Sequence, residues 1–239
     1  MIKNQYVFFY PELSSQVNVD EKLAFQFSKV LRLKTGDSVM LINGKGTQSE
    51  YRIEKAEKDF YSLKQMNSTQ KEKQKKLILA LALIRKEKLE WVLQKATELG
   101  VSQIILFNSE NSIAKTKNDL KKLKRYERII IEALEQSKGF YLPELKIHKN
   151  LHETFDSFNH QNINFFMAEQ NTHKKLTDYK EKLIKDIVFF IGPEGGFSNK
   201  ELDFFKMHKI PQVKLSQQIL RAETAAITAV AGINLLRLD

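Results

Sequence analysis

The residues with the clearest chemical potential form a short loop at positions 192–196, Gly-Pro-Glu-Gly-Gly, directly after an apolar run. Three of the nine glycines in the chain stand in this loop, so a ligand could approach its backbone closely. A buried strand that ends in such a loop places it at the carboxyl edge of a parallel sheet, where α/β proteins carry their sites. Ser198 and Glu201 then form the pattern of a capping box, which predicts a helix start. The alternative is an ordinary strand–loop–helix connection. The missing Gly-Lys-Ser/Thr ending argues against a phosphate-binding loop.

The elements that must position this loop belong to the second part of the chain. Near-continuous apolar runs predict strands at 77–84 and 101–107, joined by a helix at 86–99, and such βαβ units are parallel. The same reasoning predicts a basic helix at 118–136, strands at 163–168, 187–191 and 213–215, and a closing helix at 223–236. Residues 75–239 are therefore expected to form an α/β domain with a parallel sheet. Its closing helix is apolar over so much of its circumference that its own domain or a second subunit must cover it.

The first third of the chain carries short β signals instead. Strands are predicted at 6–10, 39–42, 51–53 and 60–63, with a helix at 20–32 that Asp20 caps and a hairpin turn at Asn43-Gly44. These elements predict a small barrel-like domain over residues 1–70. The polar stretch at 65–76 is expected to be the boundary between the two domains.

Composition narrows the classes of protein and of site. The 239 residues are 28% charged and 42% hydrophobic, which is typical of a globular chain. No run of about 18 uncharged apolar residues exists, and the N-terminus lacks a signal-peptide hydrophobic region, so we expect no membrane partner and a cytoplasmic location. The absence of cysteine excludes disulfides, thiolate catalysis and cysteine-ligated metals. The five histidines show no ligand spacing, so no metal is expected.

The net charge of +10 indicates a partner that carries phosphates, and nucleic acid is the commonest such partner. The alternative is that lysine-rich stretches are merely solvated surfaces. One cluster of lysines lies at 64–76. A second comprises Lys115, Lys117, Lys121, Lys122, Lys124, Arg125 and Arg128.

Two motifs near the C-terminus resemble those of a known family. Residues 191–198 read Ile-Gly-Pro-Glu-Gly-Gly-Phe-Ser, and residues 215–225 read Leu-Ser-Gln-Gln-Ile-Leu-Arg-Ala-Glu-Thr-Ala. Together with blocks at 29–37, 86–101 and 132–144 they are similar to the RsmE family, so the resemblance covers the whole chain. Members of this family are S-adenosylmethionine-dependent methyltransferases of the SPOUT superfamily, and they methylate N3 of a uridine in 16S ribosomal RNA of the small subunit.

The resemblance implies a fold, a cofactor and an assembly. The fold would be a PUA-like β-barrel RNA-binding domain followed by an α/β parallel-sheet domain with a SPOUT-type trefoil knot, and family members act as homodimers. S-adenosylmethionine would lie against three strand-end segments, held mainly by backbone groups. The residues implied are Ala168, Glu169, Ile191, Gly192, Pro193, Gly195, Gly196, Leu215, Ser216, Gln217, Ile219, Leu220 and Thr224.

The chemistry of uridine methylation implies roles for three charged residues. N3 of uridine is protonated at neutral pH, so a cation near the carbonyl oxygens would stabilise the anion that forms when the proton leaves. We assign this role to Arg221, with Glu223 or Glu194 orienting it or taking part in proton removal. The alternative is that Arg221 is a structural ion-pair partner of either glutamate, and that Glu194 only braces the loop through backbone N–H groups. The cations expected to contact RNA phosphates are Lys29, Arg32, Lys34, Lys121, Lys122 and Arg125.

Several positions depart from the family pattern. Ser216 and Gln218 replace the usual glycine and basic residue, Gln26 replaces an expected histidine, and Lys138-Gly139 replaces the usual Gly-Arg. Residues 110–112 lack an arginine common there. These changes leave open a methyltransferase that acts on another RNA site, and an RNA-binding homologue that has lost catalysis.

Overall fold

The computed structural model describes residues 6–113 and 120–238. Lys115 and Lys117, which belong to the second basic cluster, lie outside the described residues. The chain divides into two compact units. The first comprises residues 1–73 and 134–142, and the second comprises residues 74–133 and 143–239. Nothing in the sequence pattern indicated that residues 134–142 belong with the first unit.

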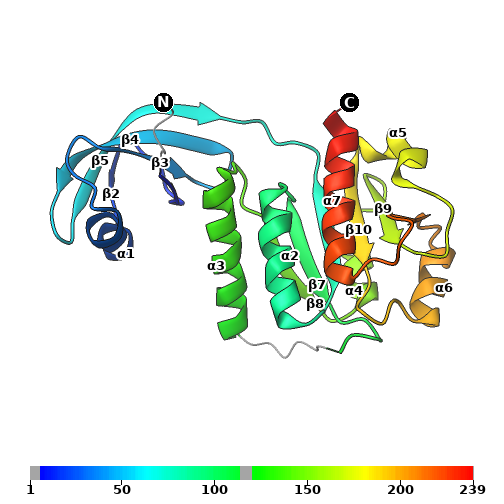
Figure 1. Cartoon of the computed structure of the whole chain (residues 1–239). Helices are drawn as coiled ribbons and strands as arrows, with labels where there is room; N and C mark the ends of the chain where they lie inside the picture. Colours follow the sequence, from blue (N-terminus) through cyan, green and yellow to red (C-terminus); the bar gives the residue numbers. More distant parts are fainter. Residues whose placement is uncertain (1–5, 114–119, 239) are drawn as a thin grey trace. The chain divides into compact units, whose positions relative to one another are not determined.

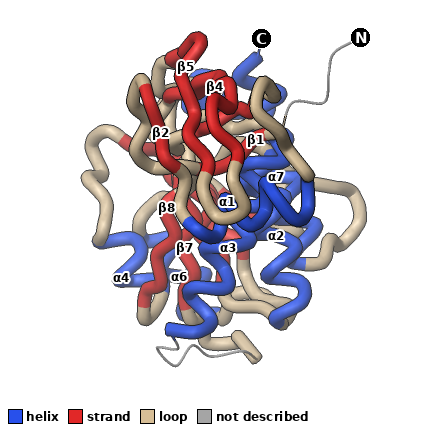
Figure 2. Tube along the Cα trace, turned by 90° about the vertical axis from the view of Figure 1, so that its left-hand side faces the viewer, coloured by secondary structure: helices blue, strands red, loops and turns tan. Residues whose placement is uncertain are grey.

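The first unit is built on a five-stranded sheet with strand order β1-β3-β4-β5-β2. β1 pairs with β3 in parallel, and the other neighbours are antiparallel. The strands are β1 (Val7–Phe9), β2 (Gln16–Asn18), β3 (Ser38–Ile42), β4 (Thr47–Ala56) and β5 (Tyr61–Gln70). Figure 2 shows β4 and β5 as a long pair.

The four strands predicted for this unit are present, but the first was predicted two residues too long and the other three too short. The polar stretch at 65–70, which was predicted to be part of a connector, instead extends β5 and pairs with β4 as far as Thr47. Backbone pairing satisfies these residues while their polar side chains stay largely exposed. β2 was missed because it is three residues long and buries one side chain, Val17.

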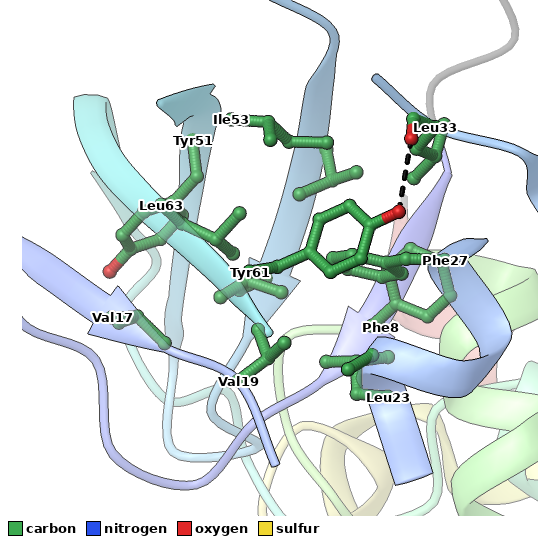
Figure 3. Packing of buried hydrophobic residues seen from close by; sticks show 13 residues of the cluster. Phe8, Val17, Val19, Leu23, Phe27, Leu33, Tyr51, Ile53, Tyr61 and Leu63 are labelled. Atoms are coloured by element: carbon green, nitrogen blue, oxygen red, sulfur yellow. Dashed lines mark hydrogen bonds between the residues drawn. The ribbon is translucent and has the colours of Figure 1, made fainter. Parts of the chain in front are cut away.

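The predicted helix at 20–32 is present in two parts. Helix α1 (Glu21–Phe25) begins as expected, since the Asp20 side chain accepts a hydrogen bond of 2.8 Å from the Leu23 backbone. It continues as a π-helix, η1 (Gln26–Leu31), which ends at Arg32 in the left-handed conformation. The core of the unit is shown in Figure 3. There Phe27 packs against Phe8 and Tyr61, with ring centroids 4.9 and 5.3 Å away, and burial raises the pKa of Tyr61.

The second unit is built on a six-stranded sheet with order β11-β9-β10-β6-β7-β8, and every pair of neighbours is parallel. This confirms the predicted α/β class. The strands are β6 (Leu77–Ala82), β7 (Gln103–Phe107), β8 (Glu144–His148), β9 (Ile163–Ala168), β10 (Asp186–Ile191) and β11 (Gln212–Val213). The strand predicted at 213–215 begins one residue earlier and ends two residues earlier, at Val213, and β8 was not predicted.

Helices cover both faces of this sheet. Helices α2 (Lys86–Glu98) and α7 (Ala222–Leu238) pack side by side over one face, as Figure 1 shows. Helices α4 (Leu151–Asp156) and α6 (Asn199–Met207) join the apolar cluster of the other face, where Phe190, Phe204 and Phe205 meet. The remaining helices are α3 (Leu120–Ser137), η2 (Leu176–Tyr179) and α5 (Lys180–Leu183).

Three helices end in a left-handed residue with the hydrogen bonds of a Schellman motif. At the end of α2 this residue is Gly100, with φ +77°, and the Val101 N–H bonds the carbonyl of Ala96. At the ends of α3 and α6 the same place is taken by Lys138 (φ 54°) and Lys209 (φ 52°). The lysine that departs from the family pattern at 138 therefore stands where glycine is favoured.

Hydrogen bonds from Arg237 hold the C-terminal end of α7 in place. The Arg237 guanidinium donates hydrogen bonds of 2.6–3.2 Å to four backbone carbonyls. These carbonyls belong to Leu183, Lys75, Lys76 and Lys185. One side chain thus links α7 to the start of β6 and to the segment before β10.

Candidate cofactor site

A cavity of about 480 Å³ lies at the carboxyl ends of β9, β10 and β11. Three segments line it: residues 168–170 at the end of β9, residues 191–197 at the end of β10, and residues between 213 and 225. All three belong to the second unit. Of the thirteen residues proposed for the cofactor, all except Gln217 and Thr224 line this cavity. Gln170, Phe197, Val213, Ala222 and Ala225 also line it and were not predicted.

The middle segment is a tight turn with little side-chain cover. The Gly196 N–H donates a hydrogen bond of 2.9 Å to the Pro193 carbonyl, and Gly196 is left-handed with φ +69°. A Cβ on Gly192 would lie 3.2 Å from the Phe197 ring. Glycine is therefore needed at position 196 for the backbone conformation and at position 192 for close packing.

A second loop, which follows β7, holds this turn from outside. The Asn111 side-chain amide donates hydrogen bonds to the carbonyls of Gly196 at 3.1 Å and Gly195 at 3.5 Å. A Cβ on Gly195 would lie 3.3 Å from the Cβ of Asn111. Asn111 was noted in the sequence only as part of a block that lacks an arginine. Its partners are more than 80 residues away, so sequence spacing carried no signal of this contact.

The turn leads directly into α6 through the predicted capping box. The Ser198 N–H donates to Glu201 at 2.9 Å, and the Glu201 N–H donates to the Ser198 hydroxyl at 3.2 Å. This confirms the predicted helix start. The same carboxylate, which is 6% exposed, also accepts a hydrogen bond from the Ser109 hydroxyl at 2.9 Å and one from the Glu110 N–H at 3.3 Å. Glu201 therefore joins the start of α6 to the loop after β7.

The two glutamates singled out as candidates for catalysis meet at Lys88. Its ammonium lies 3.4 Å from Glu223 and 3.9 Å from Glu194. Glu194 also accepts a hydrogen bond of 3.3 Å from the backbone N–H of Arg85, the residue before α2. Glu194 lines the cavity and Glu223 does not. Sequence reasoning missed Lys88, because both of its partners lie more than 100 residues away in the chain and no spacing rule connects them.

Arg221 lies on the cavity wall, one residue before α7, and is exposed. Within residues 6–113 and 120–238 its guanidinium has no ion pair or hydrogen bond. In the described residues, Arg221 is therefore a cation at the cavity without a carboxylate partner, whereas Glu194 and Glu223 contact Lys88.

The predicted RNA contacts are distributed over both units. Lys29, Arg32 and Lys34 are exposed in the first unit, and Lys121 and Lys122 are exposed in the second. Arg125, also exposed, is engaged by Glu90 through contacts of 2.7 and 2.8 Å. The described residues contain no group of acidic or histidine side chains arranged to hold a metal. No helix in the described part of the chain has both the length and the hydropathy to cross a membrane.

Comparison with known proteins identifies an RNA methyltransferase family over most of the chain. A family model for an RNA methyltransferase domain matches residues 71–234, and one for an RNA methyltransferase PUA domain matches residues 29–65. The Ribosomal RNA small subunit methyltransferase E of Rickettsia conorii is 33% identical over 87% of this chain and 84% of its own. The enzyme of the same name from Mesomycoplasma hyopneumoniae is 35% identical over 65% of this chain and 68% of its own.

Solved structures agree with the sequence comparison. The crystal structure of a Ribosomal RNA small subunit methyltransferase E from Neisseria gonorrhoeae, bound to S-adenosyl methionine, superposes with a TM-score of 0.87 at 27% identity and covers 98% of both chains. A methyltransferase from Legionella pneumophila, also in complex with this cofactor, gives a TM-score of 0.86 at 27% identity over 97% and 98%.

Proposed function

Because the chain belongs to the Ribosomal RNA small subunit methyltransferase E family, we propose that it transfers the methyl group of S-adenosylmethionine to N3 of a uridine in 16S ribosomal RNA. The observation that supports this most is the cavity at the carboxyl edge of the parallel sheet. Its volume of about 480 Å³ falls within the roughly 300–1,000 Å³ typical of small-molecule sites.

The lining of the cavity fits the proposed cofactor. Ile191, Leu215, Ile219 and Leu220 supply an apolar wall suited to a purine ring, and the residue 192–196 turn supplies exposed backbone groups. When bound, S-adenosylmethionine supplies an electrophilic methyl group, so the protein has mainly to position it. Gln217 and Thr224 belong to the same proposed set, although they stand outside the lining.

Methylation at N3 of the uridine also requires that N3 lose its proton. We propose that Arg221 faces the carbonyl oxygens of the uracil and stabilises the negative charge that they take up. Its exposed position on the cavity wall and its lack of an ion pair in the described parts of the chain support this role. Of the two candidate glutamates, we assign to Glu194 the role of orienting Arg221 or assisting proton removal, because Glu194 lines the cavity and Glu223 does not. A base paired at N3 is inaccessible, so the target nucleotide must be unstacked or single-stranded.

The RNA would be gripped by exposed cations on both units. Lys29, Arg32 and Lys34 in the PUA-like unit and Lys121, Lys122 and Arg125 on α3 are proposed to contact phosphates. Arg125 would have to exchange its Glu90 contact for a phosphate. Such contacts make binding weaken as salt rises.

We also propose that the protein acts in the cytoplasm as a homodimer. On α7, Leu235 and Leu238 are 65% and 83% exposed, and Trp91 on the adjacent α2 is 43% exposed. A second copy that covers these side chains would remove apolar surface from water. The trefoil knot implied by the family resemblance stays a prediction.

Two measurements test this function. Calorimetry with S-adenosylmethionine should give saturable binding, whereas a chain without binding would be a silent RNA-binding homologue. Ribosomal RNA from a deletion strain, with and without the gene restored, should differ in methylation at one 16S uridine N3. Methylation at another site would identify a different RNA target. Arg221→Ala should keep cofactor binding and lose most turnover, and unchanged turnover would remove Arg221 from the mechanism.

A further inference from the structure

One ammonium group joins the two chain segments that form most of the cavity wall. Lys88 stands in the first turn of α2, where its side chain is 28% exposed. Its two carboxylate partners come from the residue 192–196 turn and from the first turn of α7. Their side chains are 20% exposed at Glu194 and 14% exposed at Glu223. This cluster is thus largely removed from solvent, where ion pairs are less screened than on the surface.

The cluster holds together only if all three charges are present. Two carboxylates that share a partly buried site repel each other, and a cation between them removes the repulsion. A cation at the start of a helix is in turn disfavoured by the helix dipole, and the carboxylates compensate for that. Glu223 lies in the first turn of α7, where the dipole of its own helix favours a negative charge. Lys88 is therefore the member whose position is explained only by the other two.

The arrangement has a consequence for Arg221, which stands two residues before Glu223. The second oxygen of Glu223, Oε2, is buried without a hydrogen-bond partner in the described parts of the chain. Such an acceptor attracts any cation that can reach it. Lys88 neutralises this carboxylate through its other oxygen, and Arg221 is left exposed on the cavity wall.

We propose that Lys88 is a positioning residue for methyl transfer, because it docks the 192–196 turn against α2 and α7 and keeps Glu223 from capturing Arg221. The docking part concerns cofactor binding, and the part that involves Arg221 rests on the proposed function. Lys88 does not line the cavity, and its effect passes through the two glutamates.

The test compares five variants of the full chain, the last of which is Glu223→Gln alone. Lys88→Met keeps the length of the side chain and removes its charge, and we expect kcat to fall about tenfold or more, since a small displacement of a positioned group has effects of this size. Lys88→Arg keeps the charge and should recover most of the loss. Lys86→Met, which removes a neighbouring exposed lysine on the same helix, is the matched control and should leave kcat unchanged.

The fourth variant separates positioning from general structural support. If Lys88 acts by neutralising Glu223, then Lys88→Met combined with Glu223→Gln should restore kcat to within about threefold of the wild type, which is the non-additivity of residues that act as a pair. Each variant is also measured for cofactor affinity by calorimetry and for thermal stability.

The outcomes are distinct. A Lys88→Met enzyme with wild-type kcat, or a double variant as impaired as the single one, would overturn the proposal. Loss of activity in Glu223→Gln alone would also overturn it, because Glu223 would then act directly. A wild-type chain that transfers no methyl group to ribosomal RNA would instead refute the proposed function, and reduced cofactor affinity in Lys88→Met would still support the docking part.

Discussion

Replacing Gly196 with alanine separates the conformational role of the glycine turn from its role in ligand contact. Gly196 has φ +69°, and a Cβ built on it meets no described atom within 4 Å. The substitution therefore adds backbone strain and no clash within the protein. The added methyl group points into open space beside the cavity that Gly196 lines.

The chain offers a matched control at Gly100. That residue has φ +77°, also meets no described atom within 4 Å, and ends α2 away from the cavity lining. A non-glycine residue in this conformation costs roughly 1–2 kcal/mol. The alanine also restricts the unfolded chain, which offsets roughly 0.4–1 kcal/mol. We therefore expect each variant to lose about 1 kcal/mol, which lowers the thermal midpoint by roughly 2–4 °C for a chain of this size.

Only Gly196→Ala should weaken cofactor binding. If S-adenosylmethionine approaches the turn within van der Waals distance, the extra methyl group occupies its place, and we expect at least about a tenfold loss of affinity, equal to about 1.4 kcal/mol. Calorimetry and thermal melts on both variants and the wild type measure the two effects separately. Equal cofactor affinity in all three proteins would refute close backbone contact at this turn, and an unchanged melting point for Gly100→Ala would refute the strain argument.

Three further predictions concern stability and are measured by chemical denaturation. Lys138→Gly should stabilise the protein by about 1 kcal/mol, because it relieves a left-handed non-glycine residue (φ 54°) at the end of α3; a destabilised variant would contradict this. Burial lowers the pKa of His148, so the unfolded chain takes up the proton first and stability is lost as the pH falls below about 6.5. His148→Asn should flatten that dependence by at most about 1.4 kcal/mol per pH unit, and an unchanged slope would show that His148 is not its source. Arg237→Met should cost roughly 1–3 kcal/mol, because four backbone carbonyls lose their donor. Arg237→Lys should not recover this loss, since an ammonium cannot reproduce the planar fork.

The parts of the fold that could be predicted are those with local signals. Two helix starts were predicted from capping residues, Asp20 for one and the pair Ser198 and Glu201 for the other. Their side chains accept hydrogen bonds from backbone N–H groups three residues away. Apolar runs identified the inner strands of the second unit because both of their faces are buried. The carboxyl ends of those strands, and hence the cavity segments, followed from the same runs.

The parts that could not be predicted depend on partners distant in the chain. Residues 65–70 are polar except for Met66, and they became strand because β4 pairs with them. The sheet-edge strand β8 mixes charged and apolar residues, so it lacks the buried run that marks its neighbours. The contacts of Asn111 with the glycine turn and of Lys88 with the two glutamates span between 84 and 135 positions, and no spacing rule connects such residues.

The carboxylate of Glu201 serves two loops at once, since it completes the cap of α6 and also receives Ser109 and Glu110 from the loop after β7. A glutamine at 201 would have one acceptor oxygen for the three donors that the carboxylate now accepts from. Exchanging only the loop after β7 or only the start of α6 would therefore leave a hydroxyl or an N–H group without its hydrogen-bond acceptor. Among relatives, positions 109 and 201 should therefore vary as a pair, and a chimaera that imports the segment at 192–201 must import residues 108–112 with it.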